Sequence, residues 1–454
     1  MQRRFTRFAA RGAASMLVAA ATVTLASPQA LAALAHRYSF DSDITDSVGG
    51  ANGTVVDAGS ATNFVFAGGQ IDLSANTGEG SNGITEDAYV DLPNGIISAA
   101  SNNGTAGAVS FEMWATVSEQ HTWQRFWDFG TSDLGEDTSS NGGASGYILA
   151  TPNSGRYNNG LEITNHPASN AAEPNVGVAG PFANNVQTHV VGVYDHNDTT
   201  AGPNGTMTLY QNGVAIGTNQ IHPDIDLRTF NDNNVWLGRS QWNDATFAGR
   251  YNEFRIYNHA LSAGEALFNA VGGPDNAASG NEVLALEVNA NTGAVTLINK
   301  APFEIGLDYY AITSDGNALS TAGWNSLADK DGLPNPGAGW DEAGGASAGQ
   351  LIELYLGNPS GNLFASIGAN AEISLGNAFN PAVFGAGNDG DLEFAFRARG
   401  LGGLVSGSVT YVGEPGLPGD ANGDGTVDVD DLNLVLGNWM TAEDVGDFNG
   451  DGVV

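Results

Sequence analysis

The chain has 454 residues, and its 50 acidic against 15 basic side chains give a formal net charge of −35 at pH 7. A surface this negative repels nucleic acid and anionic lipid, so both are excluded as partners. The lack of cysteine excludes disulfides and thiol chemistry. Hydrophobic residues make up 41% of the chain, enough for packed cores, and 63 glycines favour turn-rich β structure over helical bundles.

The N-terminal segment 1–35 predicts a signal peptide. Four arginines within the first 11 residues precede the apolar run Met16–Ala26, which is short for a membrane span. The small-residue cleavage motif Ala-Leu-Ala follows at 30–32 and again at 33–35. We therefore expect a secreted or cell-surface protein with no membrane span in the mature chain. A retained membrane anchor is the alternative.

Residues 36–272 predict one large β domain. In the run 109–116, apolar Val, Phe, Met and Ala alternate with Ser, Glu, Trp and Thr, as the two faces of a strand require. Asn212-Gly213 separates two strand-like runs and predicts a tight hairpin, because both turn positions tolerate a positive φ. Near the end of this region, Ser262 and Glu265 predict the capping box of a short helix.

The order of several segments resembles that of laminin-G-like domains, which have the concanavalin A-like jelly-roll fold. These segments read SFEMWATV, RFWDFG, HVVGVYD, MTLYQNGV, VWLGRS and GRYNEFRIYNHALSAGE. The last of them is the most specific, although it departs from the family at Tyr251-Asn252, where an apolar residue and Asp are usual. The resemblance implies a β-sandwich lectin domain that binds a glycan, a polysaccharide or a surface.

Four aromatic residues lie where strands are expected to end and are candidates for a sugar-stacking platform: Trp123, Trp127, Trp242 and Tyr251. Packing in the core is the competing interpretation for each of them. Three carboxylates, Asp128, Asp195 and Glu253, are candidates for a calcium site at the rim of the sandwich. A strand-end hydrogen bond or a turn is the better explanation of each of them, so we predict no metal site there.

An enzyme on the same fold is the second hypothesis for this domain. Glycoside hydrolysis requires two carboxyl groups that flank the scissile bond. Hydrolases of this fold generally carry them as a Glu-x-Asp-x-x-Glu phrase, and the sequence contains no such phrase. It also lacks the H-E-x-x-H zinc motif. We therefore predict no catalytic residue, and keep a secreted glycoside hydrolase and a purely structural cell-surface or matrix protein as alternatives.

The segment 273–281 reads GPDNAASGN and predicts a linker by its composition. Residues 282–412 then predict a β-rich, sandwich-like module, with a hairpin around Asn291-Thr292-Gly293. This module resembles the Gly-rich β-sandwich modules that often precede dockerin-like ends in secreted bacterial proteins. A second linker, 413–419, is stiffened by Pro415 and Pro418.

The segment that begins at Asp420 has the oxygen spacing of an EF-hand calcium loop. A hard cation takes six to eight oxygen ligands, and a tightly turning loop aims alternate side chains at it. Gly425 allows the sharp turn at the sixth position, and Thr426 offers its backbone carbonyl at the seventh. The six predicted ligands are Asp420, Asn422, Asp424, Thr426, Asp428 and Asp431. A helix is expected next, because Leu432, Val435, Leu436 and Trp439 fall on one helical face.

An incomplete second copy of the loop follows 27 residues later, with Asp447, Asn449 and Asp451 in the places of Asp420, Asn422 and Asp424. Loop and helix in tandem resemble a type I dockerin, so 420–454 is expected to form an EF-hand-like, α-helical calcium-binding end. The resemblance implies a cohesin-like protein partner, although Val429 and Asp430 replace the hydroxyl pair that usually contacts it. The second copy ends at its eighth position, which suggests a fragment of a longer product; a true end with one working site is the alternative.

The sequence therefore predicts a mainly β protein: a concanavalin A-like jelly-roll β-sandwich, a second β-rich module and a dockerin-like end. Its expected function is non-catalytic binding of carbohydrate or a surface in polysaccharide breakdown, with calcium-dependent attachment through the C-terminal segment.

Overall fold

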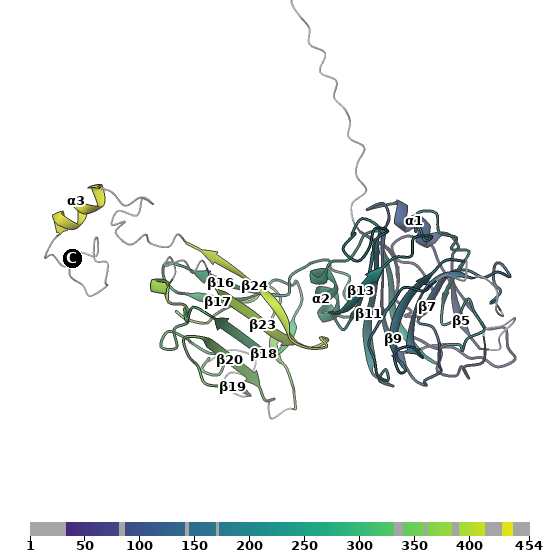
Figure 1. Cartoon of the computed structure of the whole chain (residues 1–454). Helices are drawn as coiled ribbons and strands as arrows, with labels where there is room; N and C mark the ends of the chain where they lie inside the picture. The colour runs from purple at the N-terminus through teal and green to yellow at the C-terminus, as the bar shows by residue number, and fades with distance from the viewer. Residues whose placement is uncertain are drawn as a thin grey trace, which may run out of the picture.

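The computed structural model describes residues 33–80, 87–140, 145–168, 172–330, 339–357, 361–383, 390–413 and 429–438. It is mainly β, as predicted, and forms two β domains (Figure 1). Each domain has its own hydrophobic core. Among these residues, no helix is long and apolar enough to cross a membrane. Residues 1–32 of the predicted signal peptide and most of the predicted calcium loops lie outside the described residues. Leu34 and Ala35, at the predicted end of the signal peptide, belong to the first strand, β1 (Leu34–Tyr38).

The first domain consists of two antiparallel sheets packed face to face. The eight-stranded sheet runs in the order β13 (Val214–Gln220), β12 (Thr206–Gln211), β11 (Gln187–Asp195), β6 (Ala108–Val117), β15 (Gly249–Tyr257), β4 (Ile71–Asp72) and β3 (Val65–Phe66), with β1 (Leu34–Tyr38) also paired to β15. The seven-stranded sheet runs β10 (Asn175–Gly177), β9 (Gly160–His166), β8 (Gly146–Ser154), β7 (Trp127–Thr131), β14 (Asn234–Leu237), β5 (Tyr89–Leu92) and β2 (Thr54–Val56). Two helices, α1 (Ile96–Asn102) and α2 (Ala263–Gly272), accompany the sheets. This architecture is the predicted jelly-roll-like sandwich.

The local predictions for this domain are confirmed. Asn212 and Gly213 have φ of 50° and 74° and join β12 to β13, as expected for a two-residue hairpin turn. Ser262 caps α2 by accepting from the N–H of Glu265, whose side chain accepts from the N–H of Ser262 in return. The turn chemistry and the capping box therefore form where the sequence places them.

The two faces of β6 are both buried, which the alternating pattern alone does not predict. Phe111 and Met113 lie in the core between the sheets, as expected. Glu112 and Trp114 point to the outer face, yet they are only 0% and 3% exposed. The segment that leads into α2 and the helix itself cover this face, where Leu261 and Ala266 pack with apolar residues of β11 and β12.

The second domain is a single nine-stranded sheet that curls around its own core. Its strands run β19 (Trp340–Glu342), β20 (Gln350–Tyr355), β18 (Ile305–Ser314), β23 (Leu392–Ala398), β24 (Val405–Val412), β16 (Leu284–Asn289), β17 (Val295–Asn299) and β22 (Glu372–Ser374), with β21 (Ala365–Ile367) also paired to β18 and a 3-10 turn at Pro381–Val383. β24 pairs antiparallel with β23 and parallel with β16, which closes the curl. The hairpin predicted around Asn291-Thr292-Gly293 joins β16 to β17.

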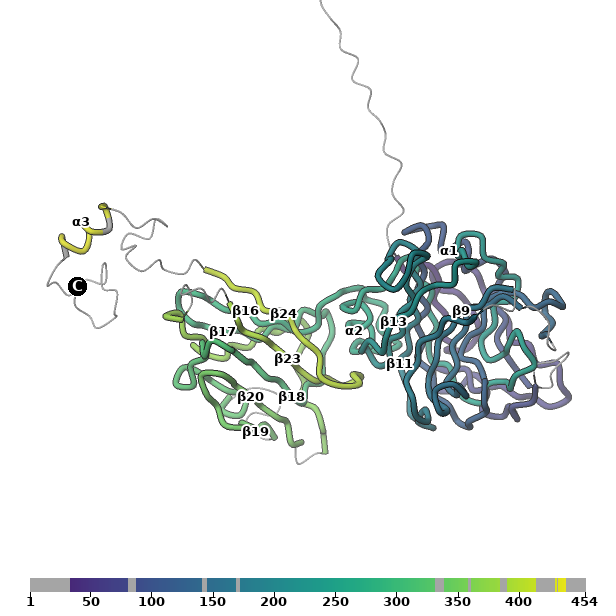
Figure 2. Tube along the Cα trace, in the orientation of Figure 1, coloured from purple at the N-terminus to yellow at the C-terminus, as the bar shows by residue number. Residues whose placement is uncertain are grey.

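Helix α2 lies between the two domains (Figure 2). Ala266 packs on the outer face of the first domain, whereas Phe268 belongs to the core of the second. The segment predicted as a linker is held in place here, because Arg255 donates to the backbone oxygens of Pro274 and Asn276.

Candidate functional site

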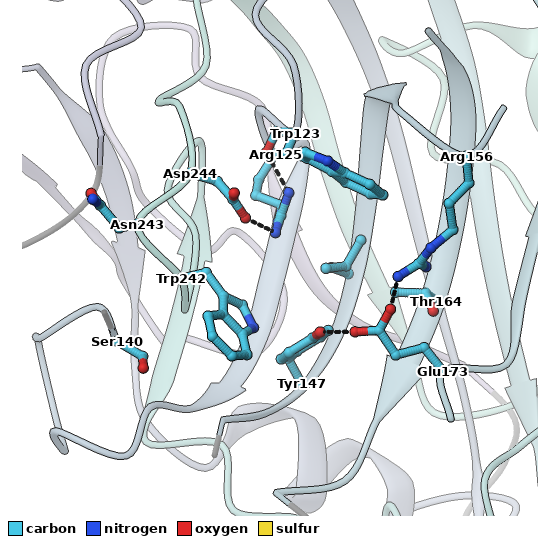
Figure 3. Close-up of a pocket in the computed structure, with 11 residues that line it drawn as sticks. Trp123, Arg125, Ser140, Tyr147, Arg156, Thr164, Glu173, Trp242, Asn243 and Asp244 are labelled. Atoms are coloured by element: carbon cyan, nitrogen blue, oxygen red, sulfur yellow. Dashed lines mark hydrogen bonds and ion pairs between the residues drawn. The ribbon is translucent and has the colours of Figure 1, made fainter. Parts of the chain in front are cut away.

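A pocket of about 420 Å³ opens on the outer face of the seven-stranded sheet (Figure 3). The alternation of β8 creates its floor, because Ile148 and Ala150 enter the core while Tyr147 and Leu149 face the opposite way. The residues that line it are Trp123, Arg125, Ser140, Tyr147, Leu149, Arg156, Thr164, Glu173, Trp242, Asn243 and Asp244. They come from β8, β9 and the loops around them, so the folded sheet is needed to assemble the pocket.

Aromatic side chains form much of the pocket wall. Trp123 lies on the segment that leads into β7 and has a left-handed backbone (φ 64°), which its N–H stabilises by donating to Asn153 O. The guanidinium carbons of Arg125 and Arg156 lie 5.9 and 5.2 Å from the Trp123 ring centroid, within cation–π range. Trp242 is half-buried in the loop after β14. The pocket therefore offers flat apolar surfaces beside fixed charges.

Arg125 forms the first charged group of the pocket. Its Nε donates to Asp128 over 3.0 Å and its Nη2 to Asp244 over 2.5 Å, and Nη1 donates to Trp123 O. Asp128 is fully buried beneath the pocket, where its Oδ2 also accepts from the N–H of Gln241. Burial raises the pKa of Asp128 to about 6, against the opposing charge of Arg125.

Arg156 forms the second charged group, from the hairpin between β8 and β9. It donates to Glu162 over 2.6 Å and pairs with Glu173, which also accepts from the hydroxyl of Tyr147. Figure 3 shows Glu173 held between Arg156 and Tyr147. Glu162 is fully buried, and its burial raises its pKa despite hydrogen bonds from Ser154 and Arg156.

The four aromatic candidates divide into two pairs. Trp123 and Trp242 line the pocket, whereas Trp127 and Tyr251 are fully buried in the core. Tyr251 still supports the site, because its hydroxyl donates to the backbone oxygens of Arg125 and Phe126. Two of the four therefore stand where a ligand has access.

The three carboxylates considered for a rim calcium site do not come together. Asp128 lies under the pocket, Glu253 pairs with Arg37 and Arg255 on the other sheet, and Asp195 accepts from the N–H of Asn197 in a turn. The structure holds no group of three or more metal-ligating side chains among the residues it describes.

Sequence patterns did not single out Arg125, Tyr147, Arg156 or Glu173. Each stands alone in its own segment, with no spacing that links it to the others. The one available signal is the small number of basic residues, 15 against 50 acidic ones. An arginine in such a chain stands out, and an arginine is rarely buried without a paired carboxylate.

Most of the predicted calcium ligands lie outside the described residues: Asp420, Asn422, Asp424, Thr426 and Asp428, and Asp447, Asn449 and Asp451 of the second copy. Asp431 falls within α3 (Val429–Asn438), the helix expected directly after the loop. Leu432 and Leu436 of its predicted apolar face are 55% and 60% exposed. The helix is confirmed, and the ligand set stays a prediction.

Residues 345–349 spell Gly-Ala-Ser-Ala-Gly, the G-x-S-x-G letters of many serine hydrolases. In those enzymes the serine stands on a sharp turn between a strand and a helix. Here Ser347 lies in the hairpin between β19 and β20, where its N–H donates to Gln350 O and its hydroxyl accepts from the N–H of Gly349. A strand follows instead of a helix, so this serine lacks the setting of a nucleophile.

Residues 81–266 match the sequence model of the concanavalin A-like lectin/glucanases superfamily, which supports the lectin-like nature of the first domain. No curated protein matches the chain.

Three solved structures illustrate what the chain is similar to. Domain 4 of AbnA, an extracellular arabinanase of Geobacillus stearothermophilus, in complex with arabinotriose, is 19% identical over 52% of this chain and 98% of its own, with a TM-score of 0.38. The CBM40 domain of the Ruminococcus gnavus IT-sialidase, bound to α2,3-sialyllactose, is 15% identical over 39% and 94%, with a TM-score of 0.29. The Trypanosoma rangeli sialidase in complex with sialic acid is 12% identical over 51% and 32%, with a TM-score of 0.33.

Proposed function

We propose that this protein is an exported, non-catalytic carbohydrate-binding protein and that the pocket beside Trp123 and Trp242 holds the sugar. The observation that carries the proposal is an open pocket in which three aromatic rings, those of Trp123, Tyr147 and Trp242, stand beside hydrogen-bonding groups fixed by ion pairs. Sugars present apolar ring faces and directional hydroxyls, which such a wall matches. The match to a superfamily that includes lectins agrees with this proposal.

The state of the carboxyl groups favours binding over hydrolysis. A glycosidase needs one carboxylic acid that stays protonated beside the scissile bond. Asp244 and Glu173 face the pocket, but each of them pairs with a guanidinium group. Asp128 and Glu162 have raised pKa values but are fully buried, so neither reaches a ligand. Among the described residues, each carboxyl group of the pocket is thus either held by a guanidinium group or buried beneath it.

Glycan binding by the full chain tests this proposal. A glycan array finds the ligand, and calorimetry then compares the chain with its Trp242→Ala variant. We expect at least a tenfold loss of affinity, which corresponds to about 1.4 kcal/mol. Trp324→Ala, which removes another half-buried tryptophan from the second domain, is the matched control and leaves affinity unchanged. Release of reducing ends from the bound glycan would favour the hydrolase instead, and silence on every glycan would favour a structural role.

The C-terminal segment is proposed to bind calcium and attach the protein to a cohesin-like partner. Two observations support this: the oxygen spacing from Asp420 to Asp431 and the start of α3 at Val429, within the last turn of the predicted loop. Calcium would join acidic groups that otherwise repel one another. Asp424→Ala is expected to abolish calcium-dependent ordering of residues 420–440 and to leave the first domain folded. Equal calcium uptake by wild type and variant in calorimetry would refute the ligand assignment.

A further inference from the structure

We propose that the pocket selects neutral glycans and rejects acidic ones such as uronic acids and sialic acids. This inference rests on the proposed function and specifies its ligand class. Its basis is the ratio of charges in and directly beneath the pocket: each of the two guanidinium groups is held by two carboxylates.

The guanidinium group of Arg125 has no free face for an anion. Asp128 binds its Nε from below and Asp244 binds its Nη2 from the side, while the carbonyl of Trp123 takes Nη1. The Arg125 side chain is only 3% exposed, so an incoming carboxylate meets the wall around it rather than the cation itself. Asp244, which is 28% exposed, presents its negative charge to the pocket instead.

Arg156 is the more accessible cation, with 37% of its side chain exposed. Glu162 binds it from the buried side and Glu173 from the pocket side. Glu173 is itself fixed by the hydroxyl of Tyr147, so it is not free to swing away from the guanidinium. An acidic sugar would therefore have to displace Glu173 from Arg156. The displaced Glu173 carboxylate would then lie beside the negatively charged group of the sugar and repel it.

Four carboxylates against two guanidinium groups leave the site with excess negative charge, in a chain whose formal charge is already −35. A neutral sugar avoids this repulsion and still meets the tryptophan rings and the exposed side chain of Asn243, which also lines the pocket. Recognition by stacking and by hydroxyl hydrogen bonds therefore fits the site better than recognition by charge.

The test compares matched ligands on the full chain. Neutral oligosaccharides are arrayed beside their uronic acid counterparts of the same linkage and length, together with sialylated glycans, at low salt. We expect each neutral ligand to bind at least tenfold more tightly than its acidic counterpart. The gap is expected to narrow as salt rises, because added ions screen the repulsion.

Glu173→Gln sharpens the test, since it removes one negative charge and frees part of Arg156. It is expected to reduce the preference for the neutral ligand at least threefold, and Asp244→Asn serves if the first variant does not fold. Glu287→Gln, at an exposed position of β16 in the second domain, makes the same change of charge and is expected to leave the preference unchanged.

The outcomes separate the two proposals. If acidic ligands bind as tightly as neutral ones and lose affinity in Trp242→Ala, the pocket binds glycans but the selectivity is refuted. If no ligand responds to Trp242→Ala, the proposed function fails, and the selectivity fails with it. A preference for neutral ligands that Trp242→Ala abolishes and Glu173→Gln weakens supports both.

Discussion

The outer faces of the two sheets in the first domain carry similar charged clusters that differ in their exposure to solvent. On the eight-stranded sheet, Arg255 lies between Glu112 and Glu253, and its side chain is 1% exposed. On the seven-stranded sheet, Arg156 lies between Glu162 and Glu173 and is 37% exposed. The difference arises because α2 and the segment 273–281 cover the first cluster. Arg255 donates to the backbone of this segment, and Asn269 of α2 donates to Glu112.

The comparison shows that an arginine between two carboxylates is not by itself a sign of a binding site. The same chemical motif stabilises an interface between domains where a helix covers it. It becomes available to a ligand where the chain leaves it open. Access, rather than residue type, separates the two roles.

Removal of the two arginines is expected to give the largest difference between the clusters. Arg255→Ala removes the cation that two buried carboxylates share and leaves Glu253 with Arg37 and Glu112 with His189. It is expected to lower the free energy of unfolding by about 3–5 kcal/mol. Arg156→Ala breaks a partly exposed pair with Glu173 and leaves the buried Glu162 with the hydroxyl of Ser154, so a smaller loss of about 1–2 kcal/mol is expected. Denaturant unfolding of both variants measures the contrast. Equal losses would mean that α2 does not seal the first cluster as described.

Glu112 in the first cluster and Asp128 beneath the pocket are expected to respond to pH in opposite directions. Burial works to raise the pKa of Glu112, but the hydrogen bond from His189 and the charges of His189 and Arg255 hold it below its ordinary 4.5. Its contribution to stability is therefore present above pH 4.5 and is lost as the pH falls. Burial raises the pKa of Asp128 from 3.8 to about 6, so its contribution is present below pH 3.8 and is lost as the pH rises through 6.

Unfolding measured between pH 3 and 8 tests these signs. Asp128→Asn is expected to reduce the decline in stability between about pH 4 and 6, because the amide does not titrate; Asp91, whose pKa burial also raises to about 6, keeps its share. Glu112→Gln is expected to reduce the loss on the acid side, to which Asp46 and Glu265 also contribute. If the decline between pH 4 and 6 persists unchanged in Asp128→Asn, another group causes it.

A smaller effect on stability is expected from weakening α2, the helix that covers the first cluster. Ser262→Ala removes the side-chain acceptor of the capping box at the start of α2 and is expected to cost about 1 kcal/mol. Because α2 separates the two domains, protease cleavage near 273–281 is expected to become faster in this variant. An unchanged cleavage rate would show that the helix stays docked without its cap.

Patterns that act over a few residues predicted much of the fold. The hairpin at Asn212-Gly213 and the cap at Ser262 depend on turn geometry and on N–H groups of neighbouring residues. Both can be predicted from the residue types within a few positions of the chain. The strand alternation in β6 likewise gave the core face correctly. Its outer face was missed because α2, about 150 residues later, covers it, and no local pattern records that contact.

The candidate site was predicted only in part, for the same reason. Trp123 and Trp242 were among the aromatic candidates, but local sequence does not distinguish them from Trp127, which is in the core. Arg125 and Arg156 line the same pocket only when the strands of the seven-stranded sheet are paired. Their place in one site therefore depends on tertiary structure. The oxygen spacing from Asp420 to Asp431 is a local pattern, and the calcium site predicted from it stays a prediction for the C-terminal segment.

A crystal structure of the protein with a bound neutral oligosaccharide tests the central claim most directly. The account predicts a sugar ring against Trp242 or Trp123 on the outer face of the seven-stranded sheet, with the pair between Arg156 and Glu173 intact. A sugar bound elsewhere, with this pocket containing only water, would contradict it.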